Sequence, residues 1–168
     1  MEKYKSRINE DWGFSNRVHE AACNFAYKKG CIIKKATFKD DCENGIDYFA
    51  TMPNGSNFSI QERFRTLNKF TINSQEFTIR YSRPTSISEN QKKSEFFKIK
   101  ADLLLYGITN NENKNFNVPI EFRRFVVVNL RDLFKAINND EILIDENLDN
   151  KKYKPYISNT GKINAIVK

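Results

Sequence analysis

The sequence predicts an α/β (α+β) fold in which helices flank a central mixed β-sheet. Residues 58–65 alternate between apolar and polar side chains, which is typical of a half-buried strand. The runs Ala101–Ile108 and Arg124–Val128 have the length and composition of buried strands. Residues 16–29 and 130–137 instead repeat apolar side chains at helical spacing. Helical and strand patterns are therefore mixed along the chain, as in a sheet covered by helices.

The expected elements can be placed in chain order from their caps and turn formers. A first helix begins at Ser15 or Asn16 and ends before Gly30. The later elements are a short strand at Cys31–Ile33, a hairpin of Gly45–Thr51 and Phe58–Arg65, a third strand at Phe77–Tyr81, a helix at Lys93–Lys100, strands at Ala101–Ile108 and Arg124–Val128, and a helix at Leu130–Ile137 capped by Asn129. Residues 39–44 are expected to form a polar loop, and Glu141–Ile144 and Ile163–Val167 short edge strands.

Length and composition bound the class of protein. The chain of 168 residues predicts a single domain, 1–168. An apolar share of 39% and 14 Phe argue against disorder. The formal charge of +7 favours a polyanionic partner such as DNA. The Lys-, Asn- and Ile-rich composition is typical of an AT-rich bacterial or phage genome.

Cysteine usage and hydropathy indicate a reducing, aqueous compartment. Three cysteines without a C-x-x-C pair, with a single His, argue against a structural zinc site. Reduced thiols in a cytoplasmic protein are the simplest interpretation. The N-terminus lacks the apolar stretch of a signal peptide, and no apolar run is long enough to span a membrane.

The hairpin carries the candidate site. Strand alternation puts Gln61 and Arg63 on one face, which could also hold Asp47 of the first strand. An acid, a carbonyl oxygen and a cation on adjacent strands form the pattern of a hydrolytic divalent-metal site. Glu62 should point the other way, with Ile60 and Phe64, unless a bulge turns it.

This order of elements and residues resembles the PD-(D/E)XK, or restriction-endonuclease-like, nuclease superfamily. In that fold a first helix carries a Glu, a hairpin carries an Asp and then (Asp/Glu)-x-Lys, and a helix and a further strand follow. Glu20 corresponds to the helical Glu, Asp47 in Gly45-Ile46-Asp47 to the metal-binding Asp, and Gln61-Glu62-Arg63 to the (Asp/Glu)-x-Lys position. Lys98–Asp102 before an apolar strand resembles the second helix and the next strand. The resemblance covers residues 14–137, which it implies form a nuclease-like core, and leaves 138–168 as a C-terminal extension.

The resemblance implies a metal-dependent nuclease that binds Mg²⁺ or Mn²⁺ through Asp47, Gln61 and Glu20 and cleaves DNA. Gln61 in place of an acid makes one ligand neutral, and Arg63 in place of Lys can bind a phosphate but cannot transfer a proton. The remaining candidates would follow the nucleic-acid backbone or stack on a base or sugar: Arg65, Arg80, Arg83 and Tyr81. The second run of the hairpin and the third strand are expected to be neighbours, which would gather the arginines at 63, 65, 80 and 83.

Plain structural interpretations stand beside these assignments. Glu20 can be an exposed helix residue, Asp47 an acid paired with a nearby Arg, and residues 61–65 the solvated face of a strand; His19 is expected at the surface. The substitutions at Gln61 and Arg63 leave open a second function, an inactive nuclease-fold module that binds nucleic acid or inhibits a protein. Endo- or exonuclease action, DNA or RNA as substrate, and homodimerisation also remain open.

Overall fold

The two runs of the expected hairpin form the middle of the main sheet. The computed structural model describes residues 13–24, 27, 30–68, 77–79, 95–112, 119–142 and 165–167. Strands β2 (Tyr48–Thr51) and β3 (Asn57–Arg65) pair antiparallel, with Tyr48 opposite Ile60. Gly55 adopts a φ of 83° in the turn, which favours glycine, as the sequence predicts. The strand predicted from the alternation of residues 58–65 is therefore confirmed as β3.

Five strands make the main sheet in the order β1-β2-β3-β5-β6. β1 (Ile32–Lys35) lies antiparallel to β2, and β5 (Leu103–Thr109) runs parallel to β3. β6 (Phe122–Asn129) closes the far edge antiparallel to β5. The sheet is thus mixed, because the connection from β3 to β5 is a crossover that passes through helix α4 (Glu95–Lys98).

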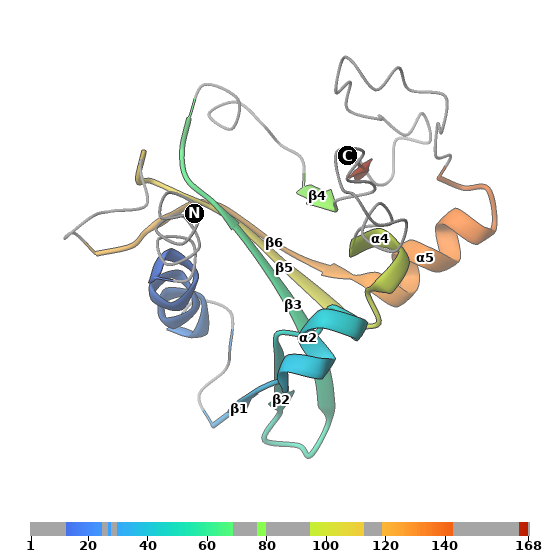
Figure 1. Ribbon diagram of the computed structural model, residues 1–168, viewed down its shortest axis with the longest axis horizontal. Helices are drawn as coiled ribbons and strands as arrows, with labels where there is room; N and C mark the ends of the chain where they lie inside the picture. The colour runs from blue at the N-terminus through green and yellow to red at the C-terminus, as the bar shows by residue number, and fades with distance from the viewer. Residues whose placement is uncertain are drawn as a thin grey trace, which may run out of the picture.

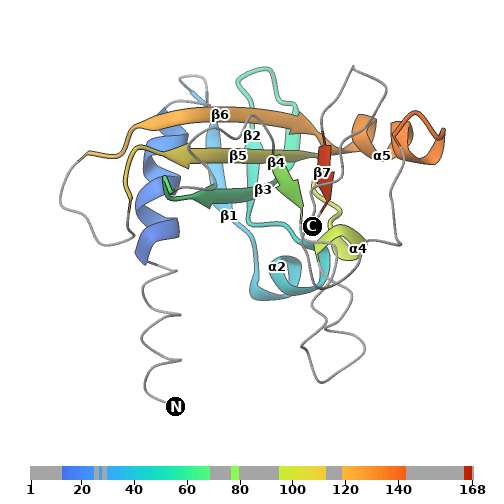
Figure 2. The ribbon, with the colours of Figure 1, turned by 90° about the horizontal axis from the view of Figure 1, so that it is seen from above.

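Helices cover both faces of this sheet (Figure 1). One face packs on α4 and α5 (Leu130–Asn138) through a core that includes Leu104, Tyr106 and Leu133. On the other face, Ala50, Ile60 and Leu105 form a smaller cluster. The helix at residues 13–24 lies along this second face, as the turned view in Figure 2 also shows. The α/β layering expected from the sequence is confirmed at this level.

Helix α2 (Phe38–Asn44) occupies residues that the sequence suggests form a loop, so that expectation is wrong. The Thr37 side chain accepts a hydrogen bond from the backbone N–H of Asp40, which caps the helix at its start. Gly45, at φ 58°, ends it in the left-handed conformation, and its N–H bonds back to the last turn. The helix buries none of its residues, so its sequence contains no apolar stripe from which the helix could be predicted.

The strand at residues 77–79 does not join the main sheet. β4 (Phe77–Ile79) pairs parallel with β7 (Ala165–Val167) in a separate two-stranded sheet. The expectation that this strand neighbours β3 is therefore wrong. A short alternating run specifies a strand but not its partner, which depends on tertiary packing.

The first helix already includes Gly13, so the expectation that Ser15 or Asn16 caps it is wrong: both residues lie within the helix. The helix expected at Lys93–Lys100 is the shorter α4, Glu95–Lys98, and the cap expected for the last helix is confirmed. α5 is capped by the Asn129 side chain, which accepts from the N–H of Asp132. Residues 141 and 142 form a bend rather than the expected edge strand, and residues 143 and 144 lie outside the described residues. Within the described part of the chain, no helix combines the length and apolarity that crossing a membrane requires.

Candidate functional site

Asp47 lies immediately before β2 and is held against the middle of β3. Its N–H donates to the carbonyl of Ile60 over 2.8 Å, and its own carbonyl accepts from Ala36 over 2.9 Å. Its carboxylate Oδ2 accepts from the backbone N–H of Glu62 at 2.6 Å and from Gln61 Nε2 at 3.0 Å. The expected meeting of Asp47 and Gln61 on neighbouring segments is therefore present.

The electrostatic environment of Asp47 disfavours its charge. Burial raises the pKa of Asp47 to about 7, and the nearby carboxylates of Asp41, Glu62 and Glu95 act in the same direction. The hydrogen bond from the N–H of Glu62 opposes them. Asp47 consequently titrates near neutral pH, and any cation placed beside it would restore its charge.

Gln61 supports Asp47 through its amide nitrogen and buries its amide oxygen. Among the described residues, Gln61 Oε1 is a buried acceptor without a hydrogen-bond partner. It lies against Gly45, where an added Cβ would come within 3.0 Å of that oxygen. The Gln61 amide therefore fits at this position because Gly45 has no side chain. The orphaned oxygen is the kind of group that a bound cation would satisfy.

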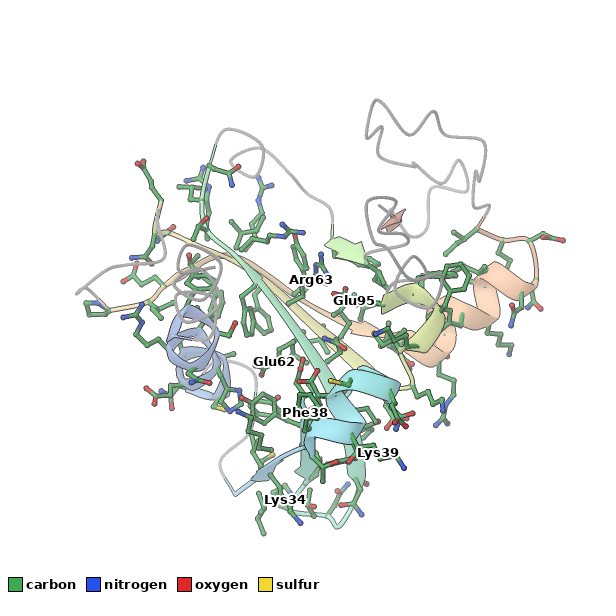
Figure 3. The ribbon with its side chains drawn as sticks, in the orientation of Figure 1. Lys34, Phe38, Lys39, Glu62, Arg63 and Glu95 are labelled. Atoms are coloured by element: carbon green, nitrogen blue, oxygen red, sulfur yellow. The ribbon has the colours of Figure 1, made fainter. Side chains whose placement is uncertain are left out.

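Arg63 points to the same face as Gln61 and is paired with a carboxylate of the crossover. Its guanidinium Nη1 contacts Glu95 Oε2 of α4 (Figure 3), and both side chains are largely buried. Arg65, the next residue on this face, is half-buried. The Arg63 guanidinium, which we expect from the sequence to bind a phosphate, is thus paired with Glu95 in this structure.

Glu62 faces the helix at residues 13–24, as strand alternation predicts. Its side chain is only 7% exposed, and both carboxylate oxygens lie 2.9 Å from His19 Nδ1. The His19 ring also stacks on Tyr48, with centroids 3.8 Å apart and an interplanar angle of 4°. The expectation of a surface histidine is therefore wrong, because His19 lies against the sheet, in contact with Glu62 of β3 and Tyr48 of β2.

The Cys23 thiol and the Tyr48 phenol lie beside the His19–Glu62 contact. Cys23, one helical turn after His19, places its Sγ 3.3 Å from His19 Nε2. Burial and the charge of Glu62 raise the pKa of Cys23 to about 11 and that of Tyr48 to about 12. Both groups are therefore neutral at physiological pH. The i, i+4 spacing of His19 and Cys23 indicates that both lie on one face of the helix. The spacing does not indicate that Glu62 is their partner.

A pocket opens at this end of the sheet, between the start of the helix at residues 13–24 and α2. Its volume is about 540 Å³. The side chains that line it come from that helix, β1, α2, the residue before β2, β2 and β3: Ser15, Asn16, Lys35, Ala36, Thr37, Phe38, Asp41, Asp47, Tyr48, Glu62 and Phe64. Asp47 and Glu62 thus share one solvent-open space, whereas Gln61 and Arg63 do not line it.

The other predicted site residues divide into two groups. Glu20 is exposed, and within the described residues it makes no hydrogen bond or ion pair with Asp47 or Gln61. Arg80, Tyr81 and Arg83 lie outside the described residues. The described ranges also contain no group of three His, Cys, Asp or Glu side chains arranged to hold a metal ion. Oxygen donors around Asp47 are present, but not as a complete set of carboxylates.

Comparisons with known proteins give no match. No family model matches the chain, and no curated protein or solved structure shows significant similarity to it.

Proposed function

We propose that this chain is a metal-dependent nuclease domain with a restriction-endonuclease-like core, which hydrolyses phosphodiester bonds of DNA. The order of elements supports this proposal. A helix covers one face of the sheet, an antiparallel hairpin carries Asp47 and Gln61-Glu62-Arg63, and a crossover with a helix leads to a strand parallel to β3. This is the order that the sequence resemblance implies.

The observation that carries the proposal is the state of Asp47 in an open pocket. A largely buried carboxylate with a pKa of about 7 shares this pocket with Glu62 and Asp41. Three acids lining one pocket repel one another unless a cation or protons compensate their charge. A divalent cation supplies that compensation, and Mg²⁺ and Mn²⁺ prefer oxygen ligands of this kind.

The chain's own residues suggest a division of roles. Asp47 and Glu62 would hold the ion through carboxylate oxygens, and Gln61 would orient Asp47 by its hydrogen bond. A bound divalent ion lowers the pKa of a water molecule and neutralises phosphate oxygens. Lys35 lines the same pocket and would bind the scissile phosphate as a compact positive charge, while His19 fixes the orientation of Glu62.

A second function has its own support. Gln61 takes the place of an acid, and Arg63, in the place of the family's Lys, is paired with Glu95. Both features suit a nuclease fold that has lost catalysis and binds nucleic acid or inhibits a protein. The two functions differ in one measurable property, metal-dependent cleavage.

The deciding experiment incubates pure protein with plasmid and with linear single-stranded DNA, in Mg²⁺, Mn²⁺ or EDTA. An active nuclease should cut only with metal, and Asp47→Ala should lower the rate by about a thousand-fold or more, because it removes the ion's central ligand. Asp132→Asn, a change at an exposed acid of α5, is the matched control and should cut normally. Equal trace cutting by wild type and Asp47→Ala would mean contamination and reject the nuclease function.

Two further variants separate the alternatives. Glu62→Gln should weaken metal-dependent cleavage if Glu62 is a ligand. Gln61→Glu combined with Arg63→Lys restores the family's residues at both positions. If wild type is inert and this double variant cuts with Mg²⁺, the chain is a decayed nuclease that serves in binding.

A further inference from the structure

Phe38 is an exposed aromatic side chain beside the candidate site. It is 82% exposed, the highest value among the large apolar side chains of the described residues. Exposing a phenyl ring forgoes the favourable burial of its apolar surface. Phe38 also lines the pocket that contains Asp47 and Glu62. An exposed ring at the edge of a charged pocket therefore calls for a partner with a flat, apolar face.

The ring is mounted on a helix that is fixed at both ends. Phe38 is the first residue of α2, next to the Thr37 cap, and Gly45 ends the helix with bonds to the carbonyls of Asp40 and Asp41. In the last turn of the helix, Lys98 Nζ donates to the carbonyl of Cys42 at 3.2 Å. The position of Phe38 is therefore set by backbone contacts, although the helix buries no side chain of its own.

Positive side chains flank this ring. Lys34 and Lys35 end β1 just before α2, and Lys39 follows Phe38; all three are exposed. Figure 3 labels Phe38, Lys34 and Lys39 at the same end of the molecule, below Glu62 in that view. Of the three acids on α2, Asp40 accepts from the Thr37 hydroxyl at 2.7 Å, Asp41 lines the pocket, and Glu43 is exposed in the last turn. Lys35 lines the pocket, and Lys34 and Lys39 are exposed next to Lys35 and Phe38 along the chain, so these lysines can meet the phosphates of a strand that reaches the ring.

We infer that Phe38 stacks on an unpaired base of DNA whose neighbouring phosphate enters the pocket at Asp47, where Lys35 contacts it, while Lys34 and Lys39 contact the flanking phosphates. This inference rests on the proposed function and names its substrate class, DNA that presents a single-stranded or unstacked nucleotide. The pocket, at about 540 Å³, falls within the range of small-ligand sites. Stacking on an aromatic ring tolerates any base, because every base has a π-face.

The inference predicts selective loss of single-strand binding. Affinity is measured in Ca²⁺ with an oligonucleotide that carries 2-aminopurine, whose fluorescence falls when it stacks. Phe38→Ala should weaken single-strand binding by between about five-fold and about a hundred-fold and abolish the fluorescence change. Phe38→Trp keeps a flat ring and should retain both. Duplex affinity should change by less than about two-fold in either variant, because duplex binding uses phosphates alone.

The matched control is Ile32→Ala, which truncates a side chain that is 70% exposed but does not line the pocket. It should bind single strands normally. Unchanged single-strand affinity in Phe38→Ala overturns the inference, as does an equal loss for single strands and duplex. A wild-type dimer that Phe38→Ala converts to a monomer would also overturn it, because the ring would then serve self-association.

Failure of this inference is distinguishable from failure of the proposed function. If Asp47→Ala abolishes metal-dependent cleavage while Phe38→Ala binds single strands normally, the nuclease stands and the stacking role falls. If wild type binds neither single strands nor duplex at low salt, both fall. A circular dichroism spectrum and melt of Phe38→Ala that match wild type show that any lost affinity is not lost folding.

Discussion

At the scale of single residues, Asp47 couples the candidate site to the stability of the protein. Its pKa is about 7 in the folded state, against 3.8 for an ordinary Asp. Between these two values the folded protein keeps a proton that the unfolded chain has released. Stability therefore falls as pH rises through this window and stays at its lower value above pH about 7.

The change Asp47→Asn should remove this dependence. Asn cannot ionise, yet its side-chain oxygen can still accept from the N–H of Glu62. We expect the variant to gain stability relative to wild type by about 3 kcal/mol more at pH 8 than at pH 5, since nearly two pH units of this window lie between them and each corresponds to about 1.4 kcal/mol. Urea unfolding at the two pH values measures the difference, with Asp132→Asn as the control. A gain of equal size at both pH values would contradict the raised pKa.

At the scale of elements, the Arg63–Glu95 pair joins β3 to the crossover helix α4. Arg63→Ala should destabilise the protein by about 2 kcal/mol, because it leaves the carboxylate of Glu95 partly buried without its main partner. Glu95→Ala should cost a similar amount for the same reason. The double variant should cost clearly less than the sum, and urea unfolding of the four proteins gives the coupling energy.

A second ion pair provides the control for this cycle. Arg131 contacts Asp102 at 3.2 Å with a guanidinium that is almost fully exposed. Arg131→Ala should therefore change stability by only about 0.5 kcal/mol. Additive losses for Arg63 and Glu95 would mean that the two side chains act independently and that the crossover is held by its apolar contacts.

The elements differ in how well the sequence predicts them. The hairpin β2–β3 is predictable because alternation and turn formers act over a few neighbouring residues, and the same alternation explains why Gln61 and Glu62 face opposite sides. Helix α2 escapes prediction because its signals are caps rather than an apolar stripe, although Thr37 followed three residues later by Asp40 is a capping pattern. β4 misleads because its own pattern carries no information about its partner strand.

The candidate site shows the same division. Asp47 immediately precedes β2 and Gln61 lies on the adjacent β3, so the spacing of the hairpin predicts their contact. His19 and Glu62 are separated by 43 residues, and only the packing of a helix on the sheet brings them together. The engagement of Arg63 by Glu95 is likewise a tertiary contact. Long-range pairs of this kind depend on the whole fold, and a single sequence does not encode them in a local pattern.

At the scale of the whole molecule, the formal charge of +7 bears on how the protein meets DNA. Cationic side chains that contact phosphates release counterions, so affinity falls with salt in proportion to the number of contacts. Lys35 lines the pocket, and Lys34 and Lys39 adjoin Lys35 and Phe38 along the chain. If these lysines contact the bound DNA strand, removing them should reduce the salt dependence of the affinity by a fixed amount per lysine. If the DNA responds only to the overall positive charge, removing any other exposed lysine should have the same effect.

The triple change of Lys34, Lys35 and Lys39 to Ala tests this expectation. On single-stranded DNA, three lost phosphate contacts should make the slope of log affinity against log salt shallower by about 2, since each contact contributes about 0.7. Fluorescence anisotropy of a labelled oligonucleotide over a series of NaCl concentrations measures the slope. Lys35→Ala alone should remove about 0.7, whereas Lys135→Ala, which removes an equal charge from the exposed side of α5, should leave the slope unchanged. Equal effects of Lys35→Ala and Lys135→Ala would mean that DNA senses only the net charge, and that the strand does not cross the mouth of the pocket.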